Sequence, residues 1–392
     1  MRFMLLVYVD ENSWSQGEWS QCTVESMAFC DQLASKGQLV DASPLHPVAN
    51  AVCVRVREGL PLVTKGPFAE TAEQLGGFFI VDVRDLDEAI SIAAELPPAK
   101  KGTVEIRQVA EVQGIPAAQF DRAKGTTPVY MLLCYDDERY WQQAPVKVQE
   151  AGMNAAIKLA TDLDLRGEYV SAAPLAPTST ATHVRVRHGK RHVMTGPFAE
   201  TREVLGGYYL LAQKNVDDAI ATAMKHPGAR VGSVEIRPIY QRHNRPAPNA
   251  CDFVIYRDFP CSAETIFNAF ANSERLARWW RPEIDSASFQ TLDFRPDGEW
   301  KFMTRDQKGT VDLQYYRFVV IRPSELLVLD HRSWPEFRLT ISLNESMPHV
   351  TTMSWRTEFP TLQRRSELAD SVSHDTQRSL DRLERELRTF NH

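Results

Sequence analysis

The stretch Gly66-Pro67-Phe68-Ala69-Glu70-Thr71 occurs a second time in this chain, as Gly196-Pro197-Phe198-Ala199-Glu200-Thr201. Both copies continue into a Leu-Gly-Gly and an aromatic pair, at 75–79 and 205–209. The offset is 130 residues, and the two copies align without gaps from about Gly37 to Arg107. Because solenoid repeats are only about 20–50 residues long, a period of this length predicts two tandem domains.

Each copy has the same order of predicted elements. In 52–57, valines and arginines alternate, as expected for a strand with one buried face. Asp85 is followed three residues later by Glu88, the pattern of a helix N-terminus. The resulting order, strand-helix-strand-strand-helix-strand, is that of a ferredoxin-like α+β domain. In the first copy these elements cover 3–9, 24–35, 52–57, 78–83, a helix from Asp85, and 103–109.

The repeated string resembles the YCII-related family, in its DGPF branch. The resemblance covers two domains, residues 1–112 and 128–241. Domains of this family are similar to dimeric α/β barrels, in which two sheets pack face to face. We therefore expect the two copies to form such a pair, a pseudo-dimer, within one chain.

This chain departs from the family pattern at the residues that would carry chemistry. The branch is named for an Asp before Gly-Pro-Phe, and Lys65 and Thr195 stand there. Members often carry a His on the first helix, where this chain has Ser26 and Ala156. The resemblance thus implies that the His/Asp pair proposed for proton transfer is missing from both copies. We expect no catalytic residue in either copy.

Several charged residues are shared by the two copies. One interpretation is a polar cleft that binds a polar or anionic small molecule. The other, which we favour, is pairing of charged side chains on a solvated sheet face, where each pair stabilises little. The shared pairs are Arg55/Arg185, Arg57/Arg187, Glu70/Glu200, Glu105/Glu235 and Arg107/Arg237.

Residues 250–392 form a third predicted domain. A strand, two helices, several strands and a long final helix follow one another, which is the helix-grip order. Asp258-Phe259-Pro260, Arg278-Trp279-Trp280 and Pro296-Asp297-Gly298-Glu299-Trp300 resemble the START-like (SRPBCC) superfamily, in the branch of the heat-shock ATPase activator homologues. That resemblance implies an apolar cavity between the sheet and the last helix.

The aromatic residues of this third domain are the candidates for lining such a cavity, because large rings offer apolar surface to a ligand. The alternative is that they fill the core of a curved sheet. The expected ligand-binding residues are Trp280, Trp300, Trp334, Trp355 and Leu380, with His331 as the polar candidate.

Composition sets further limits. The net charge of −6 gives no general attraction to nucleic acid, and no apolar run approaches the roughly 20 residues that span a bilayer. The six cysteines form no C-x-x-C pair or zinc-type cluster, so we expect free thiols in the cytoplasm, no metal and no cofactor.

The sequence favours a non-catalytic ligand-binding or regulatory protein, with an apolar or aromatic small molecule in the third domain. Because DGPF-type proteins resemble accessory partners of sigma factors, a transcription-linked role follows by analogy. Two alternatives stay open. One is an enzyme, such as a cyclase, hydrolase or lyase, acting in the same cavity. The other is a scaffold that assembles into homo-oligomers.

Overall fold

The computed structural model describes residues 1–388 apart from residue 15 and segments 68–71, 125–126, 197–202, 241–250, 281–288, 306–310 and 348–349. The chain divides into two units. The first holds Met1–Ser15 and Glu25–Arg245, and the second holds Gln16–Val24 and Pro246–His392.

The two repeats have matching elements, which belong to the first unit except for Gln16–Val24. Asp85 and Asn215 accept hydrogen bonds from the backbone N–H groups of Glu88 and Asp218, which confirms the predicted helix starts. The first repeat contains β1 (Arg2–Val9), α1 (Gln16–Ser35), β2 (Leu39–Pro44), β3 (Val52–Arg57), β4 (Leu60–Lys65), β5 (Gln74–Asp82), α2 (Leu86–Glu95) and β6 (Thr103–Gln108). The second contains β7 (Val129–Asp136), α3 (Glu138–Gln143), α4 (Val146–Leu165), β8 (Tyr169–Pro174), β9 (Thr182–Arg187), β10 (Lys190–Thr195), β11 (Val204–Ala212), α5 (Val216–Ala223), α6 (Gly228–Val231) and β12 (Ser233–Pro238).

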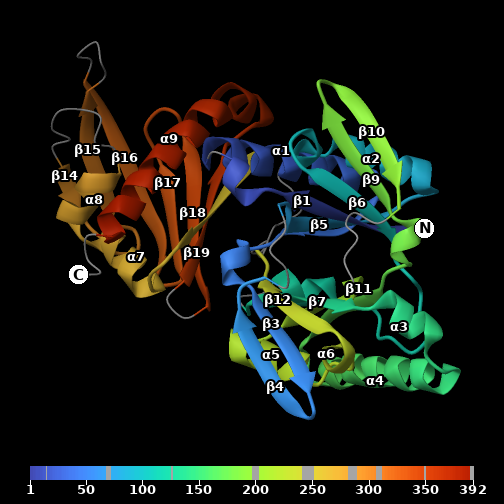
Figure 1. The fold of residues 1–392 in the computed structure, drawn as a ribbon. Helices are drawn as coiled ribbons and strands as arrows, with labels where there is room; N and C mark the ends of the chain where they lie inside the picture. Colours follow the sequence, from blue (N-terminus) through green and yellow to red (C-terminus); the bar gives the residue numbers. More distant parts are fainter. Residues whose placement is uncertain are drawn as a thin grey trace. The chain divides into compact units, whose positions relative to one another are not determined.

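The repeats exchange hairpins. One antiparallel sheet has the order β10-β9-β6-β1-β5-β2, and the other has the order β4-β3-β12-β7-β11-β8. Hairpin β3–β4 of the first repeat therefore extends the sheet of the second, with Cys53 opposite Glu235. Hairpin β9–β10 extends the sheet of the first, with His183 opposite Glu105. Figure 1 shows the blue hairpin β3–β4 beside β12 and the green hairpin β9–β10 beside β6.

This exchange corrects one prediction from the sequence. Residues 52–57 form a strand, as expected, but not the second strand of their own sheet. That place belongs to β2, which pairs with β5. Alternation predicts that a segment is a strand, but it does not specify which sheet the strand joins.

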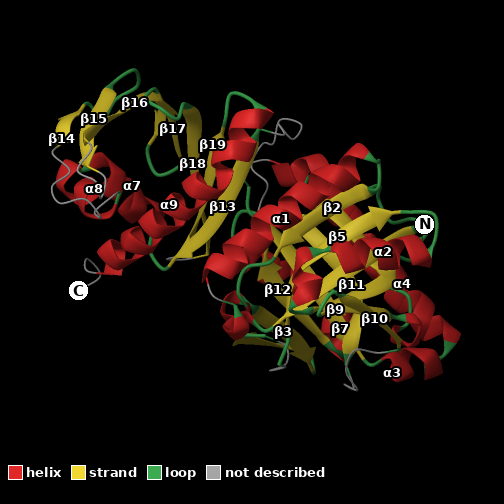
Figure 2. Ribbon diagram, turned by 90° about the horizontal axis from the view of Figure 1, so that it is seen from above, coloured by secondary structure: helices red, strands yellow, loops and turns green. Residues whose placement is uncertain are grey.

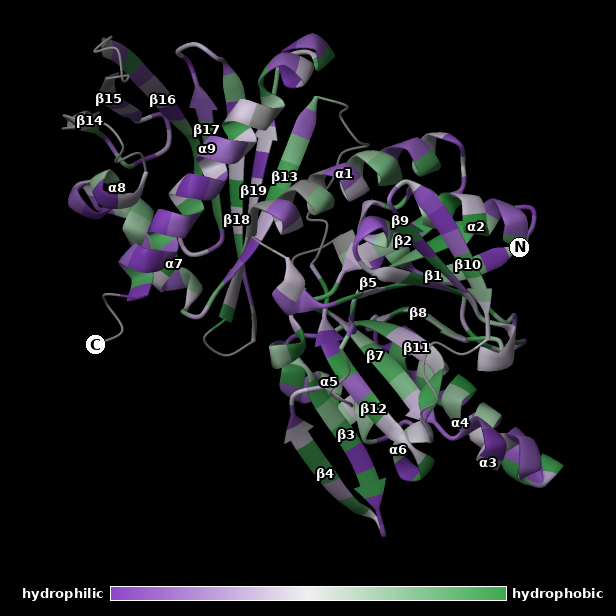
Figure 3. Ribbon diagram, turned by 45° about the horizontal axis from the view of Figure 1, so that its top comes forward, coloured by the Kyte–Doolittle hydropathy of each residue, from purple (hydrophilic) through white to green (hydrophobic). Residues whose placement is uncertain are grey.

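Each sheet of the first unit has two covered faces. The faces turned toward each other share one core, with Met4, Leu6 and Phe78 from the first repeat and Met131 and Leu133 from the second. The other face of the second sheet packs against its helices, and Val52 and Val54 of the exchanged strand β3 belong to that core. Helices cover the outer faces of the sheets (Figure 2), and hydrophobic residues are concentrated in β7 and β11 (Figure 3).

Charged residues shared by the repeats lie buried between them, and not on a solvated face. Arg107 and Arg237 are each only 1% exposed. Arg107 Nη1 bonds the Glu105 carboxylate at 3.1 Å, and its Nε donates to the carbonyl of Ala176 in the other repeat at 2.8 Å. Arg237 makes the equivalent bonds to Glu235 at 3.3 Å and to the His46 carbonyl at 3.2 Å. The favoured interpretation of solvated pairs is wrong for these residues.

The second unit contains one antiparallel sheet of order β13-β19-β18-β17-β16-β15-β14, crossed by the final helix. Leu380, Leu383 and Leu387 of that helix are buried in the core of the unit. Its elements are β13 (Asp252–Phe259), α7 (Ala263–Ala271), α8 (Ser273–Trp279), β14 (Phe289–Leu292), β15 (Glu299–Arg305), β16 (Val311–Arg322), β17 (Leu326–His331), β18 (Phe337–Met347), β19 (Val350–Glu358) and α9 (Leu362–Arg388).

The exchange predicts how an isolated repeat behaves. A fragment covering 128–241 carries hairpin β9–β10 but lacks its receiving strand β6, and its own β12 lacks β3. We expect the fragment to form a symmetric dimer that exchanges hairpins between two copies, because each copy then supplies what the other lacks. Sedimentation equilibrium measures this. A folded fragment that stays monomeric at micromolar concentration would contradict the prediction.

Candidate functional site

A pocket of about 400 Å³ lies in the second repeat, between one end of the sheet and α4. Strands β7, β8 and β11, helices α3 and α4, and the turn that leads into α6 all contribute to its wall. The side chains that line the pocket include those of Cys134, Asp136, Trp141, Met153, Tyr209 and His226.

Asp136 is the ionisable group of this pocket with a pKa closest to neutrality. It is the last residue of β7, and the indole N–H of Trp141 donates to its Oδ2 at 2.7 Å. Burial raises the pKa of Asp136 to about 6, and the Trp141 hydrogen bond opposes that rise only partly. Among the described residues, Trp141 supplies its one hydrogen bond, which leaves Oδ1 for a ligand.

His226 is held as a neutral ring. The backbone N–H of Gly228 donates to its Nδ1 at 3.0 Å, so the proton of the neutral imidazole belongs on Nε2. Nε2 lies 3.6 Å from Cys134 Sγ, and the ring meets Tyr209 edge-on. Burial lowers the pKa of His226 to about 4, so the ring carries no charge at neutral pH.

The contact between His226 and Cys134 does not activate the thiol. Burial raises the pKa of Cys134 well above its ordinary value, so the thiol stays protonated. A neutral imidazole whose Nδ1 is already occupied also cannot act as the partner cation of a thiolate. The arrangement does not favour a thiolate at Cys134, and Asp136 is the pocket group whose pKa lies nearest to neutrality.

Two glycines allow the close packing of this site. A Cβ at Gly152 would lie 2.9 Å from the Trp141 ring, and a Cβ at Gly228 would lie 2.9 Å from His226 Nδ1. Neither distance is compatible with the present positions of those rings. The glycines thus permit Trp141 to reach Asp136 and His226 to accept from the backbone.

The first repeat has apolar residues at the equivalent positions. In the sheet register, Val9 pairs with Gln74 as Asp136 pairs with Val204. By the same alignment, Val7 is the equivalent of Cys134. The constant offset of the later segments makes Phe79 the equivalent of Tyr209 and Leu96 the equivalent of His226. The polar character of the pocket therefore belongs to the second repeat.

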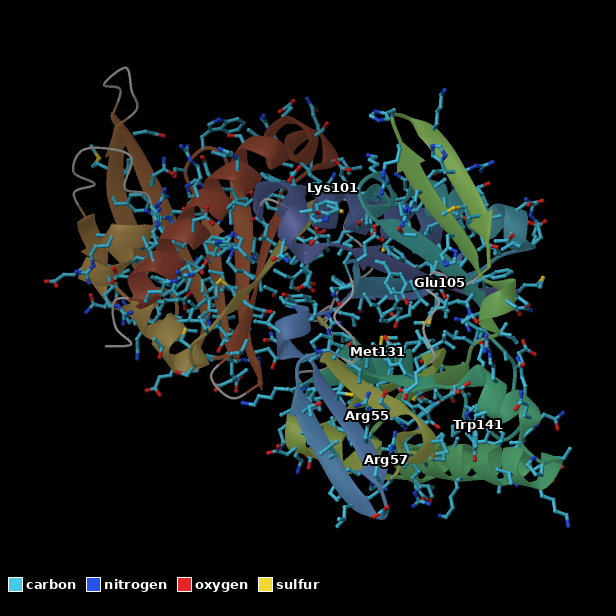
Figure 4. The ribbon with its side chains drawn as sticks, in the orientation of Figure 1. Arg55, Arg57, Lys101, Glu105, Met131 and Trp141 are labelled. Atoms are coloured by element: carbon cyan, nitrogen blue, oxygen red, sulfur yellow. The ribbon has the colours of Figure 1, made fainter. Side chains whose placement is uncertain are left out.

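The strand alignment also reveals an insertion in the second repeat. The offset between repeats is 127 in β1 and β7 but 130 from Gly37 onward, so the second repeat is three residues longer between Trp141 and the end of α4. Where the first repeat has a 3-10 turn, Glu11–Ser13, the second has helix α3, which carries Trp141 (Figure 4).

Sequence reasoning missed both Asp136 and His226, because it searched the positions that the family pattern names. A signal was present: a buried strand of the second copy ends in a carboxylate where the first has valine. The expectation that neither copy has a catalytic residue stays a prediction, and Asp136 is the group on which it can be tested.

The predicted site residues of the repeats have a different role or lie outside the described part. Glu70 and Glu200 fall outside the described residues. Arg57 and Arg187 contact no predicted cleft: each donates to backbone carbonyls of the other repeat, at Ala229, Arg230 and Gly232 for Arg57 and at Ala99, Lys101 and Gly102 for Arg187.

In the second unit, the structure places each of the predicted cavity residues. Trp280 and Trp355 line a space of about 30 Å³, roughly enough for one water. Trp300 and Leu380 are buried in the surrounding core. Trp334 is 59% exposed, with the Arg364 guanidinium 4.2 Å from its ring, so its assignment to the cavity is wrong.

His331 is buried, and its ring nitrogens already have protein partners. Nδ1 lies 2.6 Å from the Pro335 carbonyl, and Nε2 lies 3.0 Å from Gln314 Oε1 and 2.8 Å from Ser333 Oγ. These contacts account for the histidine without a ligand.

The described residues contain neither a membrane-spanning helix nor a metal-type cluster. No helix there is long and apolar enough to cross a membrane. No group of three or more His, Cys, Asp or Glu side chains in that part of the chain is placed to hold a metal ion.

Comparison with known proteins gives relatives of individual domains. An uncharacterised protein of Rhizobium meliloti (strain 1021) is 35% identical over 115 residues, which is 28% of this chain and 93% of that protein. A solution structure from Arthrobacter aurescens is 18% identical, with a TM-score of 0.33, over 36% of this chain and 87% of its own. A crystal structure from Mycobacterium smegmatis is 14% identical, with a TM-score of 0.33, over 37% of this chain and 94% of its own.

Family models cover most of the chain. The YCII-related domain matches twice, at residues 1–113 and 129–242, which together exceed half of the sequence. The model described as "Activator of Hsp90 ATPase homolog 1-like protein" matches residues 260–388. With its duplicated motif and the matching strands of its two repeats, the chain belongs to the YCII-related family and carries an Hsp90-activator-like domain after its two YCII-related segments.

Proposed function

We propose that the second repeat binds a small organic molecule in the Asp136 pocket and exchanges a proton with it. The observation that carries this proposal is a partly buried carboxyl group, with its pKa raised to about 6, in a pocket of about 400 Å³. Pockets for small ligands commonly have volumes of about 300–1,000 Å³. A carboxyl group of this pKa is mostly ionised at neutral pH and can accept a proton through Oδ1.

The charges of the wall indicate the class of ligand. No Lys or Arg is found among the described residues that line the pocket, and His226 is neutral at pH 7. An anion would therefore meet the Asp136 carboxylate without compensation. Trp141, Tyr209 and Met153 supply apolar and aromatic surface. The favoured ligand has an apolar body and a neutral or protonated basic group, such as an amine, that reaches Asp136.

The first repeat acts in this proposal as a structural partner. Its equivalent positions, Val9, Leu96 and Phe79, offer no ionisable group. We propose that the two repeats form a pseudo-dimer of ferredoxin-like halves with one ligand site per chain. The order β6-β1-β5-β2 of the first repeat and the matching order β12-β7-β11-β8 of the second support this arrangement.

The Hsp90-activator-like domain suggests an additional regulatory or ligand-binding role. The space of about 30 Å³ that Trp280 and Trp355 line beside α9 is smaller than an ordinary small-ligand pocket. The larger volume and the ionisable group both favour the second repeat as the site of chemistry.

The first test concerns the protonation of Asp136. Its folded-state pKa lies above the ordinary value of 3.8, so the folded state retains the proton as pH rises through that range, and stability falls until the carboxyl has ionised near pH 6. Asp136→Asn removes this loss. We expect the free energy of unfolding of the variant minus that of the parent to be about 2 kcal/mol larger at about pH 7.5 than at about pH 4.5. Urea unfolding at the two pH values measures the difference.

Glu150→Gln, on the exposed surface of α4, is the matched control for this measurement. Its effect on stability should be nearly the same at both pH values. An Asp136→Asn effect that is equally independent of pH would show that Asp136 ionises normally, and the proposed proton exchange would lose its basis.

The second test concerns the class of ligand. We expect an aryl-alkyl amine to bind the full chain with one molecule per chain, and the carboxylate of equal size to bind at least about tenfold more weakly, since a charge-assisted hydrogen bond contributes about 1.5–3 kcal/mol. Titration calorimetry with both compounds measures this. Asp136→Asn should weaken the amine about tenfold, whereas Val9→Thr, at the equivalent position of the first repeat, should not. Tighter binding of the carboxylate would refute the charge argument.

A further inference from the structure

Arg57 extends from the first repeat to the pocket side of the second. It is the last residue of β3, in the exchanged hairpin that packs against α6. Its guanidinium donates to the carbonyls of Ala229 at 2.9 Å, Arg230 at 3.2 Å and Gly232 at 2.8 Å. Figure 4 labels Arg57 on this hairpin and Trp141 on α3.

The turn that Arg57 holds forms part of the pocket wall. Helix α6 is a single turn, Gly228–Val231, and too short to be stable on its own. Its first residue donates the hydrogen bond to His226 Nδ1, and the Gly232 N–H closes the turn on the Gly228 carbonyl at 2.8 Å. His226, Pro227 and Gly228 all line the pocket.

We propose that Arg57 is a positioning residue for the site of the second repeat, supplied by the first repeat through its exchanged hairpin. Three charge-assisted hydrogen bonds fix two carbonyls of α6 and the carbonyl of Gly232, which directly follows it. That turn in turn presents the Gly228 N–H to His226 and sets the ring against Cys134 and Tyr209. The links run from the Arg57 guanidinium to the carbonyls of this turn and from the Gly228 N–H to the His226 ring, so displacement of α6 moves the wall that faces Asp136. This inference rests on the proposed function of the pocket.

The chain contains its own control. Arg187 makes a similar set of bonds in the first repeat, to the carbonyls of Ala99 at 2.9 Å, Lys101 at 2.9 Å and Gly102 at 3.0 Å. Ala99 and Gly102 correspond to Ala229 and Gly232, and Lys101 corresponds to Val231. The residue that corresponds to His226 there is Leu96, and the residue that corresponds to Gly228 is Pro98, which has no N–H to donate. Loss of Arg187 therefore removes the same type of side-chain-to-carbonyl contact, in a repeat that has no polar residues at the positions equivalent to the pocket.

The experiment compares Arg57→Ala, Arg57→Lys and Arg187→Ala in the full chain. Nuclear magnetic resonance with isotope-labelled glycine follows exchange of the Gly228 amide, and the ring protons of His226, assigned with His226→Gln, report its titration. We expect Arg57→Ala to accelerate Gly228 exchange at least about tenfold. The pKa of His226 should rise from about 4 toward 6.5 as water reaches the ring.

Arg57→Lys should give a smaller change, since one ammonium cannot span three carbonyls. Arg187→Ala should leave both signals unchanged even if it lowers thermal stability as much as Arg57→Ala does. The inference is overturned if Arg57→Ala leaves the Gly228 and His226 signals unchanged, or if Arg187→Ala changes them equally.

These readouts need no ligand, so they separate the inference from the proposed function. If amines fail to bind while Arg57→Ala still alters Gly228 and His226, the proposed ligand class is wrong and the positioning role stands. If amines bind and Asp136→Asn weakens them, Arg57→Ala should also weaken them about tenfold, and an unchanged affinity would overturn the role of Arg57 in the site.

Discussion

The first unit depends on the antiparallel pairing of β3 with β12 and of β9 with β6. Through these two ladders each repeat completes the sheet of the other. The apolar strand faces then become one core, and the charged residues at the joins lie buried between the repeats. Without the exchange, β6 and β12 would become sheet edges with unpaired backbone groups, and Val52 and Val54 would lose the helices that cover them.

Burying Arg107 and Arg237 is costly unless each guanidinium finds partners. Each one has a carboxylate of its own strand and a carbonyl of the other repeat. These contacts satisfy the charge only when the repeats are correctly paired. A buried ion pair of this kind adds modest stability, but it strongly disfavours alternative packing in which a charge would be left alone.

Much of this architecture could be predicted because it depends on local patterns. Repeated strings establish the duplication, and residues such as Asp85 and Ser262 mark helix starts. The hairpin exchange could not be predicted, since Val52–Arg57 has the same alternation whichever sheet it joins.

The site in the second repeat could not be predicted for a related reason. Asp136 stands where the first copy has valine, but nothing in the sequence connects it with Trp141 and His226, which α3 and the turn into α6 bring to the same pocket. In the second unit, the sequence shows that the domain is rich in aromatic rings. Whether these rings line a cavity or fill the core depends on side-chain packing, which the sequence does not specify.

Covalent linkage of the two halves has an evolutionary consequence. In a symmetric homodimer every substitution appears twice, so a change that improves one binding site also alters the surface that supports the other. Here the halves are encoded separately, so Asp136 and His226 can specialise one half while Val9 and Leu96 keep the other hydrophobic. The exchanged hairpins still bind both halves into one folding unit. A duplicated gene of this type can therefore separate the work of recognition from the work of support within a single polypeptide.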